Sequence, residues 1–288
     1  MPQMEPSDAG GEDGKTDMIV VKIGDGMGNQ LYNYACGYSA ARREGDTLKL
    51  DTSEADNSTL RDFELDKFHF VYDGRESFPN RTFWQKVYKR LRRNFRYRVI
   101  KERDINALDG RVFEKKRIRN KYLHGYWQHL GYFGEYLDEI TGMMTPAYPQ
   151  SDEVKDLIER FRREATCAVH VRGGDIVGPG RAFFEQALKR MEQEKPGLRY
   201  IVFTNDMEKS VEALSQTTLG ERINYVSELG NFSDMDEFFL MASCQNQIIS
   251  NSSYSTWAAY LNPNPEKTVI VPEYPGCEQR CMKGWIIL

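Results

Sequence analysis

The second half of the chain alternates short apolar runs with stretches of helical periodicity, and this alternation constrains the fold more than any other feature. The apolar runs have strand length and lie at 166–172, 199–204, 223–226, 247–250 and 268–271. Strands that alternate with helices of about 10–15 residues form parallel sheets covered by helices. The second half is therefore predicted to be a parallel α/β unit.

The first half shows the same alternation less regularly. Apolar runs at 18–23, 47–51 and 122–125 predict strands, and helical periodicity predicts helices over 29–43 and 132–143. These elements again favour a parallel sheet with covering helices.

Pro146 and Pro149 interrupt the pattern between the two halves. We therefore predict two domains, residues 18–148 and residues 149–288, which face each other across a cleft. The predicted fold class is α/β, with two Rossmann-type halves. Open parallel sheets bind ligands at the carboxyl ends of their strands, so polar residues at those ends are the candidates for a site.

Charge is distributed unevenly along a chain whose formal net charge is −4. Residues 1–17 contain five acids, one lysine and few apolar side chains, a composition that predicts a disordered acidic tail. Residues 81–121 form a basic insertion in which aromatic and basic side chains interleave, with helical spacing over 81–98. Such a stretch is either a solvated helix face or a contact with an anionic membrane surface or acceptor. A nucleic-acid partner is not expected, because the rest of the chain is not basic.

No apolar run approaches the ~18 residues that a membrane-spanning helix needs, and the N-terminus lacks the basic flank and apolar core of a signal peptide. The five cysteines are odd in number and scattered, which is typical of reduced thiols. A reducing compartment is therefore expected. The predicted location is the cytoplasm, peripheral at the inner face of the membrane if the basic insertion binds lipid.

The last residues of the strand predicted at 166–172 begin the sequence HVRGGD, which spans residues 170–175. His170 and Arg172 point to the same side, because side chains alternate along a strand. Arg172 carries a permanent charge and a planar donor fork that suits phosphate, and the two glycines allow a ligand to approach the backbone closely. The segment predicts the floor of a site for a phosphate-containing ligand. The alternative is a strand end at which Arg172 pairs with Asp175.

Four further clusters follow predicted strands. Residues 24–30, GDGMGNQ, open a helix but lack both the third glycine of a dinucleotide-binding fingerprint and the Lys-Ser/Thr of a P-loop. Residues 250–255, SNSSYS, place hydroxyls and amides at a helix N-terminus, which favours an anion. Asp206 offers a carboxylate that either matches the donor pair of guanine or caps the next helix. Residues 126–128, Tyr-Trp-Gln, suit either a sugar ring or core packing.

Taken together, these segments resemble the α-1,2-fucosyltransferases of glycosyltransferase family 11. The resemblance spans residues 18–272 and rests on four stretches in the family's order, at 26–35, 125–128, 170–175 and 236–262. It implies a GT-B-like fold and inverting transfer of L-fucose from GDP-fucose to the 2-hydroxyl of a terminal β-galactoside in a glycan. It also implies that no metal or other cofactor is required. In one version of this hypothesis the glycan acceptor is lipid-linked.

The resemblance assigns roles by motif. Arg172 becomes the catalytic residue that holds the pyrophosphate, His170 contacts guanine, and Asp206 is the second guanine partner. The remaining donor contacts are Gly26, Gly28, Asn29, Gln30, Asp175, Ser252, Ser253 and Ser255, and the acceptor contacts are Tyr126, Trp127 and Gln128. Residues 18–148 thus become the acceptor-side domain and residues 149–288 the GDP-fucose-binding domain.

The chain departs from the family at several positions. Asp25 stands where the family often has glycine, and Thr256 replaces one tryptophan of a usual pair. A general base would help to deprotonate the acceptor hydroxyl, and the sequence does not choose among Asp25, Asp175 and Glu237. Two alternative functions stay open: a fucosyltransferase with another acceptor or linkage, and a GDP-sugar or glycan-binding protein without turnover.

Overall fold

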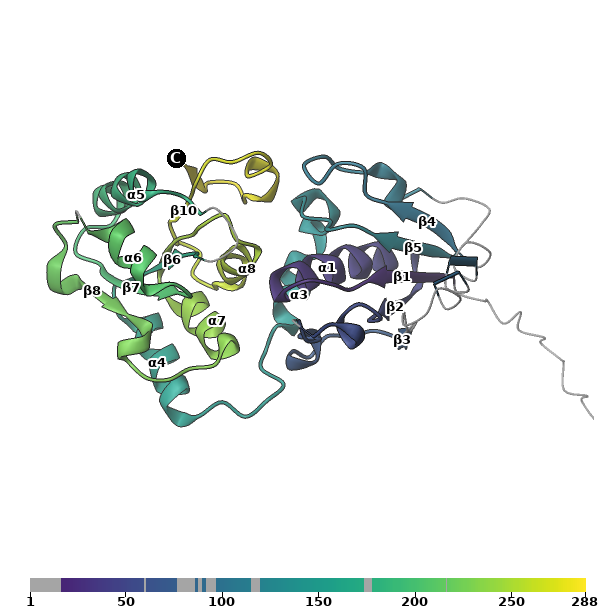
Figure 1. Cartoon of the computed structure of the whole chain (residues 1–288), viewed down its shortest axis with the longest axis horizontal. Coiled ribbons are helices and arrows are strands. Elements are labelled where there is room, and N and C mark those ends of the chain that lie inside the picture. The colour runs from purple at the N-terminus through teal and green to yellow at the C-terminus, as the bar shows by residue number, and fades with distance from the viewer. Residues whose placement is uncertain are drawn as a thin grey trace, which may run out of the picture.

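The computed structural model of the chain describes residues 17–59, 61–76, 86–87, 90–91, 97–114, 120–173, 178–215 and 217–288. Two lobes, each built on a parallel sheet, lie side by side (Figure 1). Three predictions fall wholly or partly outside the described residues: the acidic tail over 1–17, the basic insertion with its helix over 81–98, and the donor contact at Asp175.

The first lobe contains a five-stranded sheet in the order β3-β2-β1-β5-β4, and all its pairs are parallel. Its strands are β1 (Met18–Lys22), β2 (Thr47–Asp51), β3 (Arg75–Glu76), β4 (Arg98–Lys101) and β5 (Lys121–His124). Helix α1 (Met27–Glu44) packs on β1 and ends at Gly45, whose φ of 72° is the left-handed conformation that glycine readily provides.

Two local predictions for this lobe are wrong. Arg98 belongs to β4 and not to the end of a helix, because it pairs with Lys121 of the neighbouring strand. Helix α3 (Leu137–Met143) is shorter than the helix predicted over 132–143. Residues 130–136 form two 3-10 turns instead, and glycines in them weaken a continuous α-helix.

The second lobe contains a six-stranded sheet in the order β11-β10-β9-β6-β7-β8, again with parallel pairs throughout. Its strands are β6 (Thr166–Val171), β7 (Arg199–Thr204), β8 (Ile223–Tyr225), β9 (Asn246–Ile248), β10 (Val269–Val271) and β11 (Ile286–Ile287). Its helices are α4 (Asp152–Arg163), α5 (Arg181–Glu194), α6 (Met207–Leu214), α7 (Asp234–Ser243) and α8 (Ser253–Leu261). Apolar residues of α5 and α6 pack on one face of this sheet.

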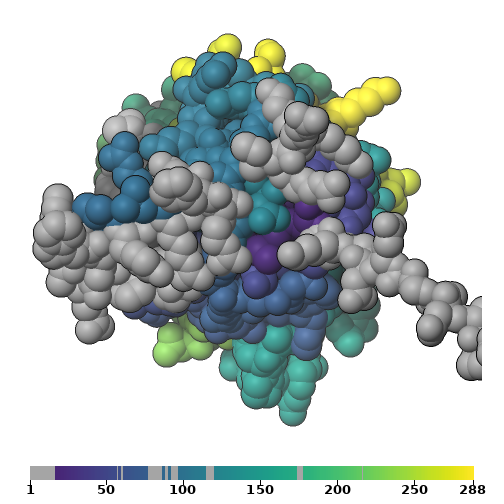
Figure 2. Space-filling view, turned by 90° about the vertical axis from the view of Figure 1, so that its right-hand side faces the viewer, coloured from purple at the N-terminus to yellow at the C-terminus, as the bar shows by residue number. Residues whose placement is uncertain are grey.

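One apolar core continues from the first lobe into α7 and α8 of the second. Helix α1 packs against α8, and the ring of Tyr32 lies 5.2 Å from that of Trp257, centroid to centroid. Phe133 stacks on the same tryptophan at 5.4 Å. Figure 1 shows α1 and α8 side by side where the lobes meet, and Figure 2 views the first lobe from the side away from the second. This shared aromatic packing fixes the relative position of the two sheets.

The described helices include none that is both long and apolar enough to cross a membrane. All five cysteines carry free thiols, and Cys36, Cys167 and Cys244 are buried.

Candidate active site

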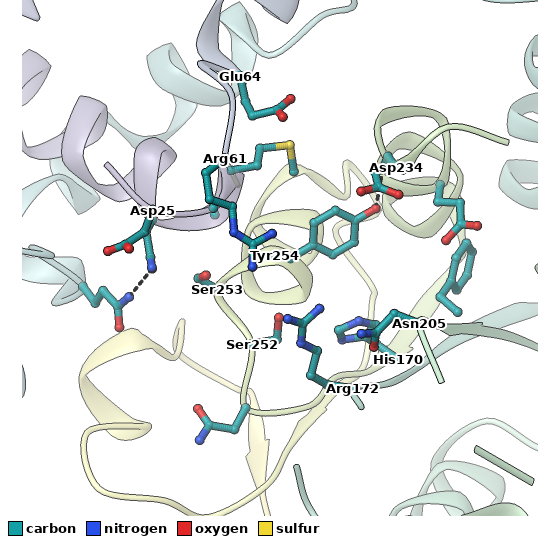
Figure 3. A pocket seen from close by; sticks show the side chains of 18 of the residues that line it. Asp25, Arg61, Glu64, His170, Arg172, Asn205, Asp234, Ser252, Ser253 and Tyr254 are labelled. Carbon is teal, nitrogen blue, oxygen red and sulfur yellow. Dashed lines mark hydrogen bonds between the residues drawn. The ribbon is translucent and has the colours of Figure 1, made fainter. Parts of the chain in front are cut away.

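A cleft of about 670 Å³ lies where the two lobes meet, and both lobes contribute to its wall. The first lobe supplies residues that follow β1 and β5, and the second supplies residues that follow β6, β7 and β9. The carboxyl ends of strands in both sheets therefore face one another across it, which is where open α/β sheets bind ligands. Figure 3 shows part of its lining, with Asp25 and Arg61 on one side and His170 and Arg172 on the other.

His170 is held at the floor of the cleft in its neutral form. Every residue of β6 is buried, and the imidazole Nδ1 lies 2.9 Å from the hydroxyl oxygen of Ser250. Burial and the nearby charge of Arg172 lower the pKa of His170 to about 3. A neutral imidazole keeps one nitrogen as a donor and one as an acceptor. This chemistry fits recognition of a polar ligand group better than pairing with a phosphate.

Two helices begin at this cleft, and their N-termini are close together. Helix α1 begins after Gly26 and α8 after Ser252, and neither N-cap residue caps its helix with a side-chain hydrogen bond. The contact depends on Gly28, because a Cβ at that position would lie 2.5 Å from the hydroxyl oxygen of Ser253. Amides at helix N-termini carry partial positive charge. With Arg172 beside them, they make this part of the cleft suitable for an anion.

Amide side chains of the first lobe join separate loops. Gln128 donates from Nε2 to Oδ1 of Asn29 at 2.7 Å, and both residues line the cleft. Gln30 is fully buried and donates to the backbone oxygens of Asp25 and Asp62, at 2.9 and 2.8 Å. Gln30 therefore positions the loops that line the cleft and does not line it.

Most of the predicted site residues that the structure describes line this one cleft. They are Gly26, Gly28, Asn29, Tyr126, Gln128, His170, Arg172, Ser252 and Ser253. Tyr126 is the most open aromatic among them, with 43% of its surface exposed. Residues distant in sequence thus meet at one place, although their individual roles stay predictions.

Besides Gln30, three predicted contacts do not line the cleft, because their side chains are used elsewhere. Trp127 is fully buried and packs edge-on against Tyr132, so its indole belongs to the core. Ser255 is also buried, and its hydroxyl donates to the backbone oxygen of Ser252 at 3.3 Å. Asp206 caps α6 by accepting a hydrogen bond from the backbone nitrogen of Lys209 at 3.1 Å.

The cleft also contains residues that no sequence pattern marks as part of a site. Arg61 comes from an irregular polar stretch, and in Figure 3 its guanidinium reaches from the first lobe toward Tyr254 and Ser253. Arg280 comes from a short C-terminal 3-10 turn. Asn205 lines the cleft in place of Asp206, and its Oδ1 accepts from the backbone nitrogen of Gly173 at 2.9 Å. Neither arginine belongs to a recognisable motif, so only the fold reveals them.

Acidic residues of α7 form the remaining part of the wall. Asp234 and Glu237 line the cleft, and Tyr254 donates from its hydroxyl to the backbone oxygen of Asp234 at 2.6 Å. Burial, with a smaller effect of Asp234, raises the pKa of Glu237 to about 7. Among the described residues, no group of three or more histidine, cysteine, aspartate or glutamate side chains is arranged to hold a metal ion.

The sequence pattern that defines Glycosyl transferase family 11 matches residues 15–286. The chain belongs to glycosyl transferase family 11. It is similar to an α-1,2-colitosyltransferase of Escherichia coli, with 25% identity over 93% of this chain and 98% of the relative. It is also similar to the O-antigen biosynthesis glycosyltransferase WbnK of Escherichia coli, with 25% identity over 87% of this chain and 92% of that protein.

Solved structures agree with the fold of this glycosyl transferase family 11 chain. The fucosyltransferase NodZ from Bradyrhizobium aligns over 86% of this chain and 94% of its own, with a TM-score of 0.51 and 17% identity. A mutant of FUT1 from Arabidopsis thaliana in complex with GDP aligns over 91% of this chain and 72% of its own, with a TM-score of 0.53 and 13% identity. The predicted α/β, GT-B-like fold class is thereby confirmed. The family membership makes the chain a glycosyltransferase.

Proposed function

We propose that this glycosyltransferase transfers L-fucose from GDP-fucose to the 2-hydroxyl of a terminal β-galactoside in a glycan, with inversion at the anomeric carbon. The observation that carries the proposal is the arrangement of Arg172 and two helix N-termini around one cleft. Such an arrangement suits the pyrophosphate of a nucleotide-sugar donor without requiring a metal ion.

The choice of GDP as the nucleotide rests on two kinds of support. Two proteins with similar folds have been solved with GDP bound, a FUT1 mutant from Arabidopsis thaliana and the NodZ α-1,6-fucosyltransferase. In this chain, the neutral His170 and the amide of Asn205 line one end of the cleft beside two carboxylates of α7. Carboxylates and amides can accept hydrogen bonds from the N–H groups of guanine.

The chemical step needs a leaving group that carries negative charge away. As the bond from the anomeric carbon to the β-phosphate oxygen breaks, charge develops on that oxygen. Arg172 and the amides that open α1 and α8 are already oriented in the cleft, so they stabilise this charge without rearrangement. Preorganised charge stabilisation of this kind is often the largest single contribution to catalysis.

A second donor sugar is supported by one relative. The similar Escherichia coli protein is an α-1,2-colitosyltransferase, and its similarity extends over nearly the whole chain. A colitosyl donor with the same α-1,2 linkage is therefore the second candidate function. Tyr126 and Gln128 would contact the acceptor in either case, because they line the first-lobe side of the cleft.

The deciding experiment incubates the purified chain with GDP-fucose and a panel of glycans that end in β-galactose. We expect release of GDP and a product with an α-1,2 linkage by NMR. A parallel reaction contains GDP-colitose, and a preference for it selects the second candidate. GDP binding without GDP release from either donor identifies a binding protein without turnover and rejects the proposal.

A further inference from the structure

Asp25 adopts a backbone conformation that an aspartate side chain makes unfavourable. Its φ is 59°, in the left-handed region, and among the described non-glycine residues only Trp127 shares this feature. Aspartate tolerates this conformation better than most residues, but glycine adopts it without strain. Residues held in such conformations are concentrated at functional sites. The carboxylate at this position therefore requires an explanation beyond the turn itself.

The surrounding structure holds this turn in place. The buried Gln30 donates a hydrogen bond to the backbone oxygen of Asp25 at 2.9 Å, and the same amide group donates to the backbone oxygen of Asp62 at 2.8 Å. The side chain of Asp25 is exposed at the cleft and does not participate in this support. The backbone of Asp25 is thus held in place by Gln30, while its carboxylate is free to contact a ligand in the cleft.

Asp25 lies on the wall that we assign to the acceptor. Its charge raises the pKa of the nearby Tyr126 hydroxyl, which lines the same part of the cleft. In Figure 3 the carboxylate lies across the cleft from Arg172 and His170. An inverting displacement needs its nucleophile on the side of the anomeric carbon away from the leaving oxygen, and a carboxylate that faces Arg172 across the cleft can take the proton there.

The other acids of the cleft fit this position less well. Asp234 and Glu237 belong to α7 in the second lobe, on the same side as His170. Glu64 is in the first lobe but forms an ion pair with Lys67 at 2.5 Å. Asp62 is an exposed acid of a loop whose backbone is bound by Gln30, and no strain marks its position.

We infer that Asp25 is the base that accepts the proton of the acceptor hydroxyl. The inference rests on the proposed function. The acceptor oxygen forms a bond to the anomeric carbon while the bond from that carbon to the β-phosphate oxygen breaks, and its electron pair leaves with GDP. The hydroxyl proton passes to the Asp25 carboxylate and then to water, so the products are the glycoside, GDP and one proton.

Two substitutions at this position distinguish a catalytic role of the carboxylate from a structural role of the residue in the turn. Asp25→Asn preserves a residue suited to the left-handed conformation but cannot accept the proton, and Asp25→Gly removes both the carboxylate and the strain. Asp66→Asn, at an exposed position of the same lobe that does not line the cleft, is the matched control. The measurements are kcat and KM for transfer, Kd for GDP by calorimetry, and the thermal midpoint Tm.

We expect Asp25→Asn to lower kcat about a hundredfold, a typical effect of losing a general base, with Kd for GDP within about twofold. Asp25→Gly is expected to lose as much activity while its Tm rises. Asp66→Asn retains the wild-type kcat. If Asp25→Gly keeps kcat within about threefold of wild type, Asp25 is only a turn residue. If Asp25→Asn changes KM for the acceptor alone, it only binds. Either result overturns the inference.

Failure of the proposed function gives a different result. A wild-type chain that releases no GDP from GDP-fucose or GDP-colitose with any acceptor rejects the proposed function, and the inference with it. A wild-type chain that transfers sugar, beside an Asp25→Asn variant with unchanged kcat, rejects the inference alone.

Discussion

Gly28 of α1 lies directly against Ser253 of α8, so the first turns of two helices from different lobes are in contact. A Cβ on Gly28 would lie 2.5 Å from Oγ of Ser253 and 2.6 Å from the backbone nitrogen of Tyr254. Because one of these atoms belongs to the backbone, a side-chain rotation cannot relieve the overlap. The close approach brings both helix N-termini to one anion site.

Gly28→Ala is expected to separate these two helices. Overpacking of this kind typically costs about 1–3 kcal/mol of folding free energy, and here it also moves amides away from the proposed pyrophosphate position. We therefore expect a lower Tm and at least a tenfold weaker affinity for GDP, measured by thermal unfolding and calorimetry. Gly142→Ala in α3 is the control, since a Cβ there meets no atom within 4 Å. Equal GDP affinity in the two variants would contradict the proposed anion site.

Arg172→Ala is expected to lower kcat for transfer by about 10²–10³, the usual effect of removing one preorganised group that stabilises transition-state charge. Arg172→Lys retains the charge but loses the planar donor fork, so an intermediate kcat is expected. Steady-state kinetics with GDP-fucose provide the measurement. Circular dichroism checks that both variants are folded. A folded alanine variant with the wild-type kcat would remove Arg172 from the mechanism.

The sequence predicted those parts of the fold in which local pattern and tertiary structure agree. The strands at 166–172 and 199–204 are recognisable because central strands of a parallel sheet are buried on both faces and are therefore mostly apolar. The short edge strand β4 contains Arg98 and Lys101 and has no such signal. It is a strand only because β5 lies beside it.

The residues of the candidate site also fall into two groups, those that a local pattern predicts and those that only the tertiary structure places. His170 and Arg172 could be predicted because glycines and a buried strand surround them. Trp127 could not be placed, because an aromatic side chain near a strand end is equally suited to a sugar or to a core, and here the core contains it. Arg61 had no pattern at all, since its place in the cleft depends on how a long irregular loop folds back on α1.

Acid should weaken the fold through His170. The pKa of His170 in the folded chain is about 3, below its usual value of 6.5, so only the unfolded chain binds a proton there between these values. The free energy of unfolding is therefore unaffected by this histidine above about pH 6.5 and falls as the pH drops from there toward 3. Between pH 7.5 and 5.0 the loss in the free energy of unfolding is about 2 kcal/mol. Tm measured across this range should therefore fall less in His170→Asn than in wild type.

The exposed His69 provides the control for this titration. His69→Gln should retain the wild-type dependence of Tm on pH, because this substitution leaves the buried imidazole in place. Parallel pH dependence in His170→Asn and wild type would show that other groups dominate acid unfolding.

Glu237 should lower the stability of the fold as the pH rises, opposite in direction to His170. The pKa of its carboxyl is raised from 4.5 to about 7, so between these values the unfolded chain releases a proton that the folded chain keeps. Stability therefore declines as the pH rises through this window, and above pH 7 the full cost of the buried charge remains. Solvent screening limits this cost to about 1 kcal/mol, because the side chain is only partly buried.

Glu237→Gln is consequently expected to raise Tm by about 2 °C at pH 8 and to leave it unchanged at pH 4.5, measured by calorimetry at both values. Glu266→Gln, at an exposed position outside the cleft, should leave Tm unchanged at both. An equal rise of Tm at pH 4.5 and pH 8 would mean that glutamine improves packing and not charge. A carboxylate retained at the cleft wall despite this cost is expected to serve ligand binding, so the more stable variant should bind GDP more weakly.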